Sequence, residues 1–237
     1  EIKIEKVIKT LLYLVPSLTL LFISGFFYPF ILTRTLYFIL FIQLALSLYI
    51  FLLALNFKKY KPHFNLATLL FLSFLAINFL AAIFGLDFYN SFWSSFERME
   101  GVISLIYLSF YLFLLTNIFK DKKDWLLNIR VILAVSCLVS LYGIVQRYNI
   151  FNVFEAGTTR VGSTIGNSAF LAGFLLLAIG SGLYYYFQEE NKKYRNISLA
   201  VTFLNLAVLL MTGTRGAILG LVVGLFVFMI INAIFVR

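Results

Sequence analysis

Five arginines form a set of their own in this chain, because hydropathy places them on the opposite side of a membrane from every lysine. They are Arg34, Arg98, Arg147, Arg160 and Arg215. A guanidinium group is planar and carries paired N–H donors that match the oxygens of a phosphate or carboxylate, whereas an ammonium group is a point charge. We therefore expect some of these arginines to bind an anionic substrate. The alternative is that they only anchor the protein in lipid headgroups.

Two of the arginines lie in similar loops of small and hydroxyl residues, each directly before an apolar segment. Arg160 belongs to the loop 151–167, within its stretch 157–167, and Arg215 to the turn 212–216. Asn167 or Ser168 can cap the helix that follows the first loop. The amino terminus of a helix presents backbone N–H groups, and beside an arginine it favours an anion. The glycines have an alternative role, because small residues also let membrane helices pack closely.

Arg98 lies in a third polar loop, 87–101, which is rich in aromatic residues. Such rings settle at a membrane interface in any case, and this is the simpler explanation for them. Glu97 and Glu100 flank Arg98, so the three charged residues have the alternative of pairing with one another.

The elements that must position these loops are apolar helices. The chain of 237 residues is 62% hydrophobic and 12% charged, whereas soluble proteins are about 45–50% apolar and about 25% charged. We expect an all-α, polytopic transmembrane helical bundle that forms a single membrane domain over residues 1–237. Hydropathy divides it into about eight spans. The expected spans are 11–30, 36–55, 66–86, 102–119, 125–146, 168–187, 197–211 and 217–236.

One of these spans is too short as drawn. The segment 197–211 gives about 22 Å of helix, against a hydrocarbon core of about 30 Å. Either its helix begins within the preceding loop, or the turn 212–216 lies below the membrane surface and brings Arg215 to membrane depth. An arginine at that depth would be a functional candidate.

The distribution of basic residues predicts the orientation. Of the 19 basic residues, 14 fall on the side of the amino terminus, including all the lysines. Because cytoplasmic loops carry an excess of Lys and Arg, we expect both chain ends in the cytoplasm and the five separate arginines outside.

Composition also excludes several function classes. The net charge of +9 has its source in topology and contact with lipid headgroups, so we expect no nucleic-acid partner. The single cysteine, Cys137, permits neither a disulfide nor a cysteine metal site. The one histidine, His63, lies in a basic cytoplasmic loop, and no metal or other cofactor is expected. Proton-coupled transport is disfavoured because no acidic residue lies near the middle of a span.

Three segments resemble the O-antigen ligase and polymerase family of multi-pass bacterial membrane proteins. Residues 91–101, SFWSSFERMEG, resemble its aromatic loop ending in Glu-Arg-Met-x-Gly. Residues 160–171, RVGSTIGNSAFL, are similar to its Arg-x-x-x-Thr-x-Gly-Asn-x-x-x-Leu loop. Residues 212–220, TGTRGAILG, resemble its Thr-x-Ser/Thr-Arg-Gly-Ala-x-x-Gly turn, and 26–30, FFYPF, fits as well. The motifs occur in family order along the chain.

The resemblance implies an inverting, metal-independent glycosyltransferase in the plasma (inner) membrane, with its active side facing outward. It would transfer a glycan from an undecaprenyl-diphosphate carrier to a lipid or protein acceptor, as in lipopolysaccharide biosynthesis. Arg98, Arg160 and Arg215 occupy motif positions, so the resemblance implies that they hold the diphosphate. Asn167 also falls in a motif, whereas Arg34 and Arg147 match none as clearly and remain further candidates for substrate binding.

The family's large outward loop with its histidine, and the later spans, would lie beyond Arg237. We therefore expect this chain to be an amino-terminal part with a donor site, inactive alone and with no catalytic residue of its own. Ligase, glycan polymerase and protein O-glycosyltransferase remain open. A flippase or transporter for lipid-linked oligosaccharides is the first rival, disfavoured by the absence of an internal repeat. A structural membrane subunit is the second.

Overall fold

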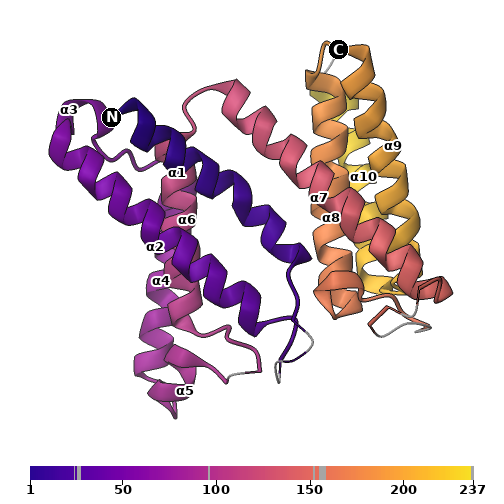
Figure 1. The fold of residues 1–237 in the computed structure, drawn as a ribbon, viewed down its shortest axis with the longest axis horizontal. Coiled ribbons are helices and arrows are strands. Elements are labelled where there is room, and N and C mark those ends of the chain that lie inside the picture. The colour runs from indigo at the N-terminus through magenta and orange to yellow at the C-terminus, as the bar shows by residue number, and fades with distance from the viewer. Residues whose placement is uncertain (24, 26–27, 96, 152, 155–158, 236–237) are drawn as a thin grey trace. The chain divides into compact units, whose positions relative to one another are not determined.

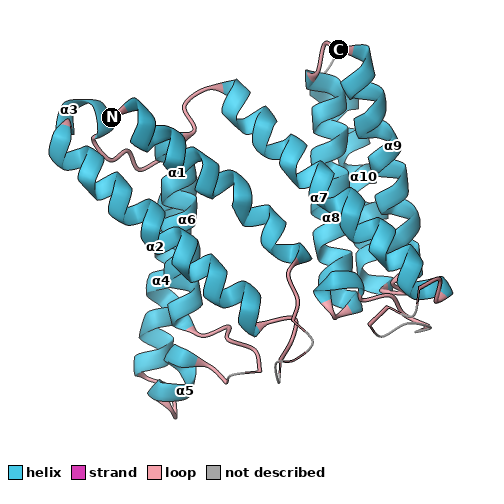
Figure 2. Cartoon of the chain, viewed as in Figure 1, coloured by secondary structure: helices cyan, strands magenta, loops and turns pink. Residues whose placement is uncertain are grey.

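The computed structural model of the protein describes residues 1–23, 25, 28–95, 97–151, 153–154 and 159–235. Within these ranges the regular elements are all helices (Figure 2), which agrees with the expected all-α class. The chain divides into two compact units, Glu1–Asn128 and Ile129–Arg237, and each is described by itself. The expectation of a single membrane domain stays a prediction.

In the described part of the chain, five helices are long and apolar enough to cross a membrane. They are α2 (Leu32–Leu55), α4 (Leu66–Ile83), α7 (Lys122–Tyr148), α8 (Ser168–Gln188) and α9 (Lys192–Met211). Two further helices, α6 (Val102–Ile118) and α10 (Arg215–Phe235), contain shorter apolar stretches. Much of the large apolar surface on these helices is exposed, which suits contact with lipid rather than water. The helices are therefore compatible with a multi-pass membrane protein.

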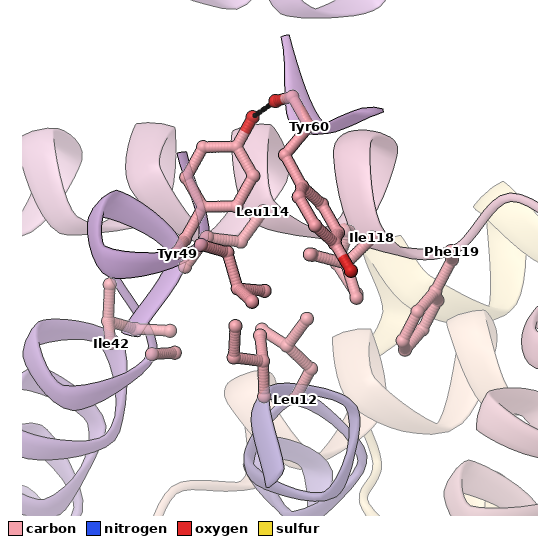
Figure 3. Close-up of a cluster of buried hydrophobic side chains, with 11 residues drawn as sticks. Leu12, Ile42, Tyr49, Tyr60, Leu114, Ile118 and Phe119 are labelled. Atoms are coloured by element: carbon pink, nitrogen blue, oxygen red, sulfur yellow. Dashed lines mark hydrogen bonds between the residues drawn. The ribbon is translucent and has the colours of Figure 1, made fainter. Parts of the chain in front are cut away.

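Unit 1 is built around α1 (Ile2–Leu14), α2 and α6, with α4 packed against α6 (Figure 1). Its core contains aliphatic and aromatic side chains from all three central helices. Figure 3 shows Leu12, Ile42 and Leu114 meeting in this cluster. The buried hydroxyl of Tyr49 donates a hydrogen bond to the carbonyl of Tyr60 at 2.8 Å, so the short α3 (Phe57–Tyr60) is held against the core.

The first expected span, 11–30, is not one helix. The α-helix begins at Ile2 and ends at Leu14, and a 3₁₀ helix, η1, follows over Val15–Leu20. Pro16 explains the change, because proline lacks an N–H donor and its ring clashes with the carbonyl four residues earlier. Part of the expected motif at 26–30 lies outside the described residues.

Unit 2 consists of the carboxyl-terminal part of α7 with α8, α9 and α10, and α8 and α9 form its closest helix pair. Gly182 allows this approach, since a Cβ atom there would lie 2.2 Å from Oγ1 of Thr202. The Ser198 hydroxyl donates to the Gly182 carbonyl at 2.8 Å. Small residues and interhelical hydrogen bonds of this kind join helices where water does not compete.

A buried polar group also joins α7 to α9. The amide of Asn205 accepts a hydrogen bond from Ser140 at 2.8 Å and donates one to Ser136 at 2.9 Å. All three side chains are fully buried. Because unpaired polar groups are costly in an apolar interior, this arrangement favours one register between the two helices.

The helix expected over 197–211 is longer in the structure. α9 begins at Lys192 and contains 20 residues, which gives about 30 Å of helix. Of the two alternatives left open by the sequence, the structure therefore supports the one in which the helix starts within the preceding loop. Arg215 consequently lies at the end of a full-length span, in the first position of α10.

Candidate anion-binding site

The two small-residue loops predicted from the sequence lie against each other in unit 2. The backbone N–H of Val161 donates to the carbonyl of Met211, with a nitrogen-to-oxygen distance of 3.5 Å. The hydroxyl of Thr214 donates to the carbonyl of Ser168 at 3.3 Å. Segments far apart in the chain are thus joined at the end of unit 2 where α8 and α10 begin and α9 ends.

Arg160 makes the main side-chain link between these loops. Its Nε donates to the carbonyl of Thr212 at 3.1 Å, and its Nη2 lies 3.4 Å from Oγ1 of Thr214. Thr212 is the C-cap residue of α9, and a cation is favourable beside the carbonyl groups of a helix carboxyl terminus. Arg160 therefore holds the turn 212–214 in place, although the residue as a whole remains exposed.

The turn itself needs a glycine at its centre. Gly213 has φ +63°, a left-handed conformation that other residues adopt with strain. The Arg160 side chain passes close to it, because Cγ and Nε would each lie 3.7 Å from a Cβ atom at this position. The backbone conformation therefore calls for glycine between the two threonines, whereas a Cβ atom there would make only an ordinary van der Waals contact with Arg160.

Arg147 approaches the same region from the last turn of α7. Its Nη1 donates to the carbonyl of Thr159 at 2.5 Å. Thr159 directly precedes Arg160 in the chain. The neighbouring Gln146 is 1% exposed and uses both ends of its amide. It accepts from the N–H of Ser163 at 2.8 Å and donates to the carbonyl of Phe154 at 3.3 Å. The loop that carries Arg160 is therefore fastened to α7.

Arg215 is exposed, and in the described part of unit 2 the protein does not engage its side chain. Among the described residues its guanidinium group has no hydrogen-bond or ion-pair partner. The backbone N–H groups of Arg215 and Gly216, in the first turn of α10, likewise have no acceptor among the residues that the structure describes. Free N–H groups and a free guanidinium side by side suit a negatively charged oxygen.

Asn167 has a defined structural position. It is the N-cap residue of α8, and its Oδ1 accepts from the N–H groups of Ala169 at 2.8 Å and Phe170 at 3.4 Å. The cap predicted from the sequence is therefore present. Because the cap satisfies these two N–H groups, the start of α10 has more donors free than the start of α8.

The two remaining candidate arginines belong to unit 1. Arg34 is partly buried in the first turns of α2. It lies in sequence beside residues of a small apolar pocket, which is lined by Ile23, Leu32, Thr33, Leu36, Tyr37 and Leu40. Arg98 is exposed, and its guanidinium group forms no ion pair with Glu97 or Glu100 in the described structure. The alternative that these three charges pair with one another is thus not seen.

The loop that carries Arg98 turns tightly at Gly101. A Cβ atom on Gly101 would lie 2.3 Å from the carbonyl oxygen of Phe92, in the short helix α5 (Phe88–Trp93). Backbone at this distance cannot move aside as a flexible side chain can. Asp87 caps α5 by accepting from the N–H of Asn90 at 3.0 Å. The glycine that ends this motif therefore allows the chain to cross the α5 backbone.

Sequence reasoning missed Gln146 and Thr214 as parts of the site. Gln146 carried a usable signal, because an amide at the end of an apolar span beside an arginine needs partners. His63 is exposed, as expected. In the part of the chain that the structure describes, no group of three or more His, Cys, Asp or Glu side chains is placed to hold a metal ion.

Comparison with known proteins adds no assignment: no family model, curated protein or solved structure matches the chain.

Proposed function

We propose that this protein binds a glycan carried on undecaprenyl diphosphate and takes part in transferring that glycan to an acceptor at the outer face of the plasma membrane. The observation that carries the proposal is the meeting of the loops 159–167 and 212–216, which brings Arg147, Arg160 and Arg215 into one region. Three cations held close together repel one another unless an anion lies between them.

The location of the site within unit 2 supports a substrate carried by a lipid. The arginines lie at the end of α8 that begins with Ser168, whereas Lys192 and Lys193 follow the other end of the same helix. The 21 residues of α8 span about 30 Å, close to the thickness of the hydrocarbon core. With the lysines in the cytoplasm, the arginines face the outer headgroups, where a diphosphate on a lipid carrier would lie.

The arginines would then have different roles. Arg215 and the free N–H groups of α10 are the groups available to contact the diphosphate directly. Arg147 and Arg160 use some donors on backbone carbonyls and keep the loops in position, while their charge still acts on a neighbouring anion. Arg98, in unit 1, stays a separate candidate for binding an anion.

The chemical contribution of such a site is electrostatic. When the acceptor hydroxyl attacks the anomeric carbon from the side opposite the leaving group, its proton passes to a base on the acceptor side, the bond to the diphosphate oxygen breaks, and negative charge builds on that oxygen. Preorganised guanidinium and N–H donors stabilise this charge without reorganising during the reaction. A metal ion is not required for this role, because the arginines supply the positive charge.

A test in cells compares arginine with lysine at the site. In cells without their native copy, glycan attachment is measured for the complete protein carrying Arg215→Lys or Arg34→Lys, with membrane levels measured in parallel. Loss of a preorganised donor to developing charge costs about 10²–10³ in rate, so Arg215→Lys should lose most transfer and Arg34→Lys much less. Near-normal transfer by Arg215→Lys would contradict the proposal.

A flippase for lipid-linked oligosaccharides is the second candidate, because it also requires arginines for the diphosphate. The same cells distinguish the two functions. Loss of a flippase would leave the lipid-linked glycan on the cytoplasmic face, whereas loss of a transferase would let it accumulate on the outer face.

A further inference from the structure

We propose a second anion site at the opposite end of unit 2, where Arg195 of α9 and Tyr186 of α8 bind the phosphate group of an anionic phospholipid in the leaflet on the lysine side. The Cζ atom of Arg195 lies 5.3 Å from the centre of the Tyr186 ring. This contact orients the guanidinium group through a cation–π interaction, without a carboxylate.

Arg195 differs from the other arginine at this end of the helices. Arg130 donates from Nη2 to Oε2 of Glu189 at 2.7 Å, and from Nε to the hydroxyl of Tyr185 at 2.5 Å. The Tyr185 hydroxyl in turn donates to Glu189. Hydrogen bonds from Tyr185, from the N–H of Asn191 and from Arg130 lower the pKa of Glu189 to about 2. Glu189 is therefore ionised, and Arg130, Tyr185 and the N–H of Asn191 engage both of its oxygens, so it does not neutralise Arg195.

The surroundings of Arg195 remain positive. Lys192 and Lys193 are exposed and have no ion-pair partner among the described residues. Glu190 is the other acidic residue of this hairpin, and it is exposed and forms no ion pair in the described structure. Arg195 itself is partly buried, and its Nε atom is buried without an acceptor. This segment of the chain thus carries three cations and one carboxylate outside the Glu189 cluster, and its net positive charge attracts an anion.

The neighbouring surface indicates that the anion belongs to a lipid. Phe187 is 70% exposed and Ile197 is 49% exposed, on the helices that carry Tyr186 and Arg195. Exposed apolar side chains at the end of a membrane-spanning helix contact acyl chains, and Lys or Arg beside them contacts headgroups. A phospholipid can contact the cations with its phosphate and the apolar side chains with its acyl chains, whereas free phosphate can contact only the cations.

The hairpin between α8 and α9 is rigid enough to hold such a site. Asn191 caps α9 by accepting from the N–H of Lys193 at 2.9 Å, and its own N–H donates to Glu189 at 3.1 Å. Arg130 also lies over the Tyr194 ring, 5.1 Å from its centre. These contacts fix the backbone between Tyr186 and Arg195, so little order has to be gained when a headgroup binds.

The test is lipid retention by the purified chain after release from nanodiscs that contain equal amounts of phosphatidylglycerol and phosphatidylcholine. Native mass spectrometry should show phosphatidylglycerol retained preferentially by the wild-type protein. A cation near a membrane surface contributes about 1 kcal/mol, or roughly a fivefold change in binding. Arg195→Gln should therefore reduce retention about fivefold, and Tyr186→Leu should also reduce it although the charge is kept.

Lys58→Gln is the matched control, because it removes an exposed cation that has no ring contact among the described residues. It should leave retention unchanged, and inorganic phosphate at millimolar concentration should not displace the lipid. Equal losses in Arg195→Gln and Lys58→Gln would overturn the site in favour of diffuse attraction. Displacement by inorganic phosphate would overturn the lipid assignment. If Arg195→Gln does not fold, undiminished retention by Tyr186→Leu would overturn the proposal.

Discussion

The Nε atom of Arg160 donates a hydrogen bond to the carbonyl of Thr212 at 3.1 Å, across 52 positions of the chain. This contact joins the two loops, around Arg160 and Arg215, that resemble each other in sequence: each has one arginine among small and hydroxyl residues. It also assigns Arg160 a structural task that its motif did not suggest. Arg215, three residues after Thr212, keeps its guanidinium group free for a ligand.

The two arginines should therefore respond differently to replacement by lysine. Arg160→Lys keeps the charge but cannot make both contacts of the guanidinium group, and a hydrogen bond involving a charged group contributes about 1.5–3 kcal/mol. We expect Arg160→Lys to lower Tm in detergent and to increase hydrogen–deuterium exchange in the turn 212–214. Arg215→Lys should change neither quantity. Equal Tm values for both variants and the wild type would refute the structural role of Arg160.

Two glycines of α8 form a matched pair for testing helix packing. A Cβ atom on Gly182 would lie 2.2 Å from Thr202 Oγ1, whereas a Cβ on Gly180 meets nothing within 4 Å. Gly182→Ala should destabilise unit 2 by about 1–3 kcal/mol through overpacking. Gly180→Ala should be neutral or stabilising, because alanine favours a helix over glycine by about 1 kcal/mol. Thermal unfolding in detergent measures both, and an unchanged Tm for Gly182→Ala would show that α8 and α9 are not so close.

The Glu189 cluster predicts a pH dependence of stability. The pKa of Glu189 is lowered from 4.5 to about 2, first by the Tyr185 hydrogen bond and then by the contacts from Asn191 and Arg130. A lowered folded-state pKa stabilises the fold above the unfolded-state value, and this stabilisation is lost as the pH falls through the folded-state value. Wild type should exceed Glu189→Gln in Tm at pH 6, and the difference should shrink between pH 4.5 and about 2. A difference independent of pH would contradict the ionised state of Glu189.

Topology is tested by labelling of single cysteines in intact cells. Because Lys and Arg are retained on the cytoplasmic side, cysteines in place of Lys59, Lys122 and Lys192 should be protected from an impermeant reagent. Cysteines in place of Ser94 and Thr159 should react. The background of this experiment is a variant in which Cys137 is changed to Ala. Reaction at position 192 together with protection at position 159 would show that the chain has the opposite orientation.

Much of the helical architecture could be predicted from the sequence, for reasons of local physics. Long apolar segments must form helices in lipid, so α2, α4, α7 and α8 occur close to their expected ranges. The end of the first α-helix at Leu14, within the first expected span, could have been predicted from Pro16. The start of α9 at Lys192 was less readable, since a helix can extend through the polar residues Lys192–Asn196 before it enters lipid.

The site was only partly predictable. The caps by Asn167 and Asp87 are local features, because the acceptor and the N–H groups lie within a few residues. The contact between Arg160 and Thr212 depends on how α7, α8 and α9 pack, which residue spacing does not encode. For the same reason the amide of Gln146 could not be assigned to Ser163.

The most direct test of the account is binding of undecaprenyl diphosphate to the purified 237-residue chain, measured by native mass spectrometry beside undecaprenol, which has the same chain without phosphate. Loss of a charge-assisted contact of about 1.5–3 kcal/mol corresponds to at least roughly tenfold weaker binding. The account predicts that the wild-type chain binds undecaprenyl diphosphate but not undecaprenol. Arg215→Lys should bind the diphosphate at least tenfold more weakly. Lys61→Gln, which changes a residue on the side of the lysines, should bind it as tightly as the wild type. Equal binding of undecaprenyl diphosphate by Arg215→Lys and the wild type would contradict it.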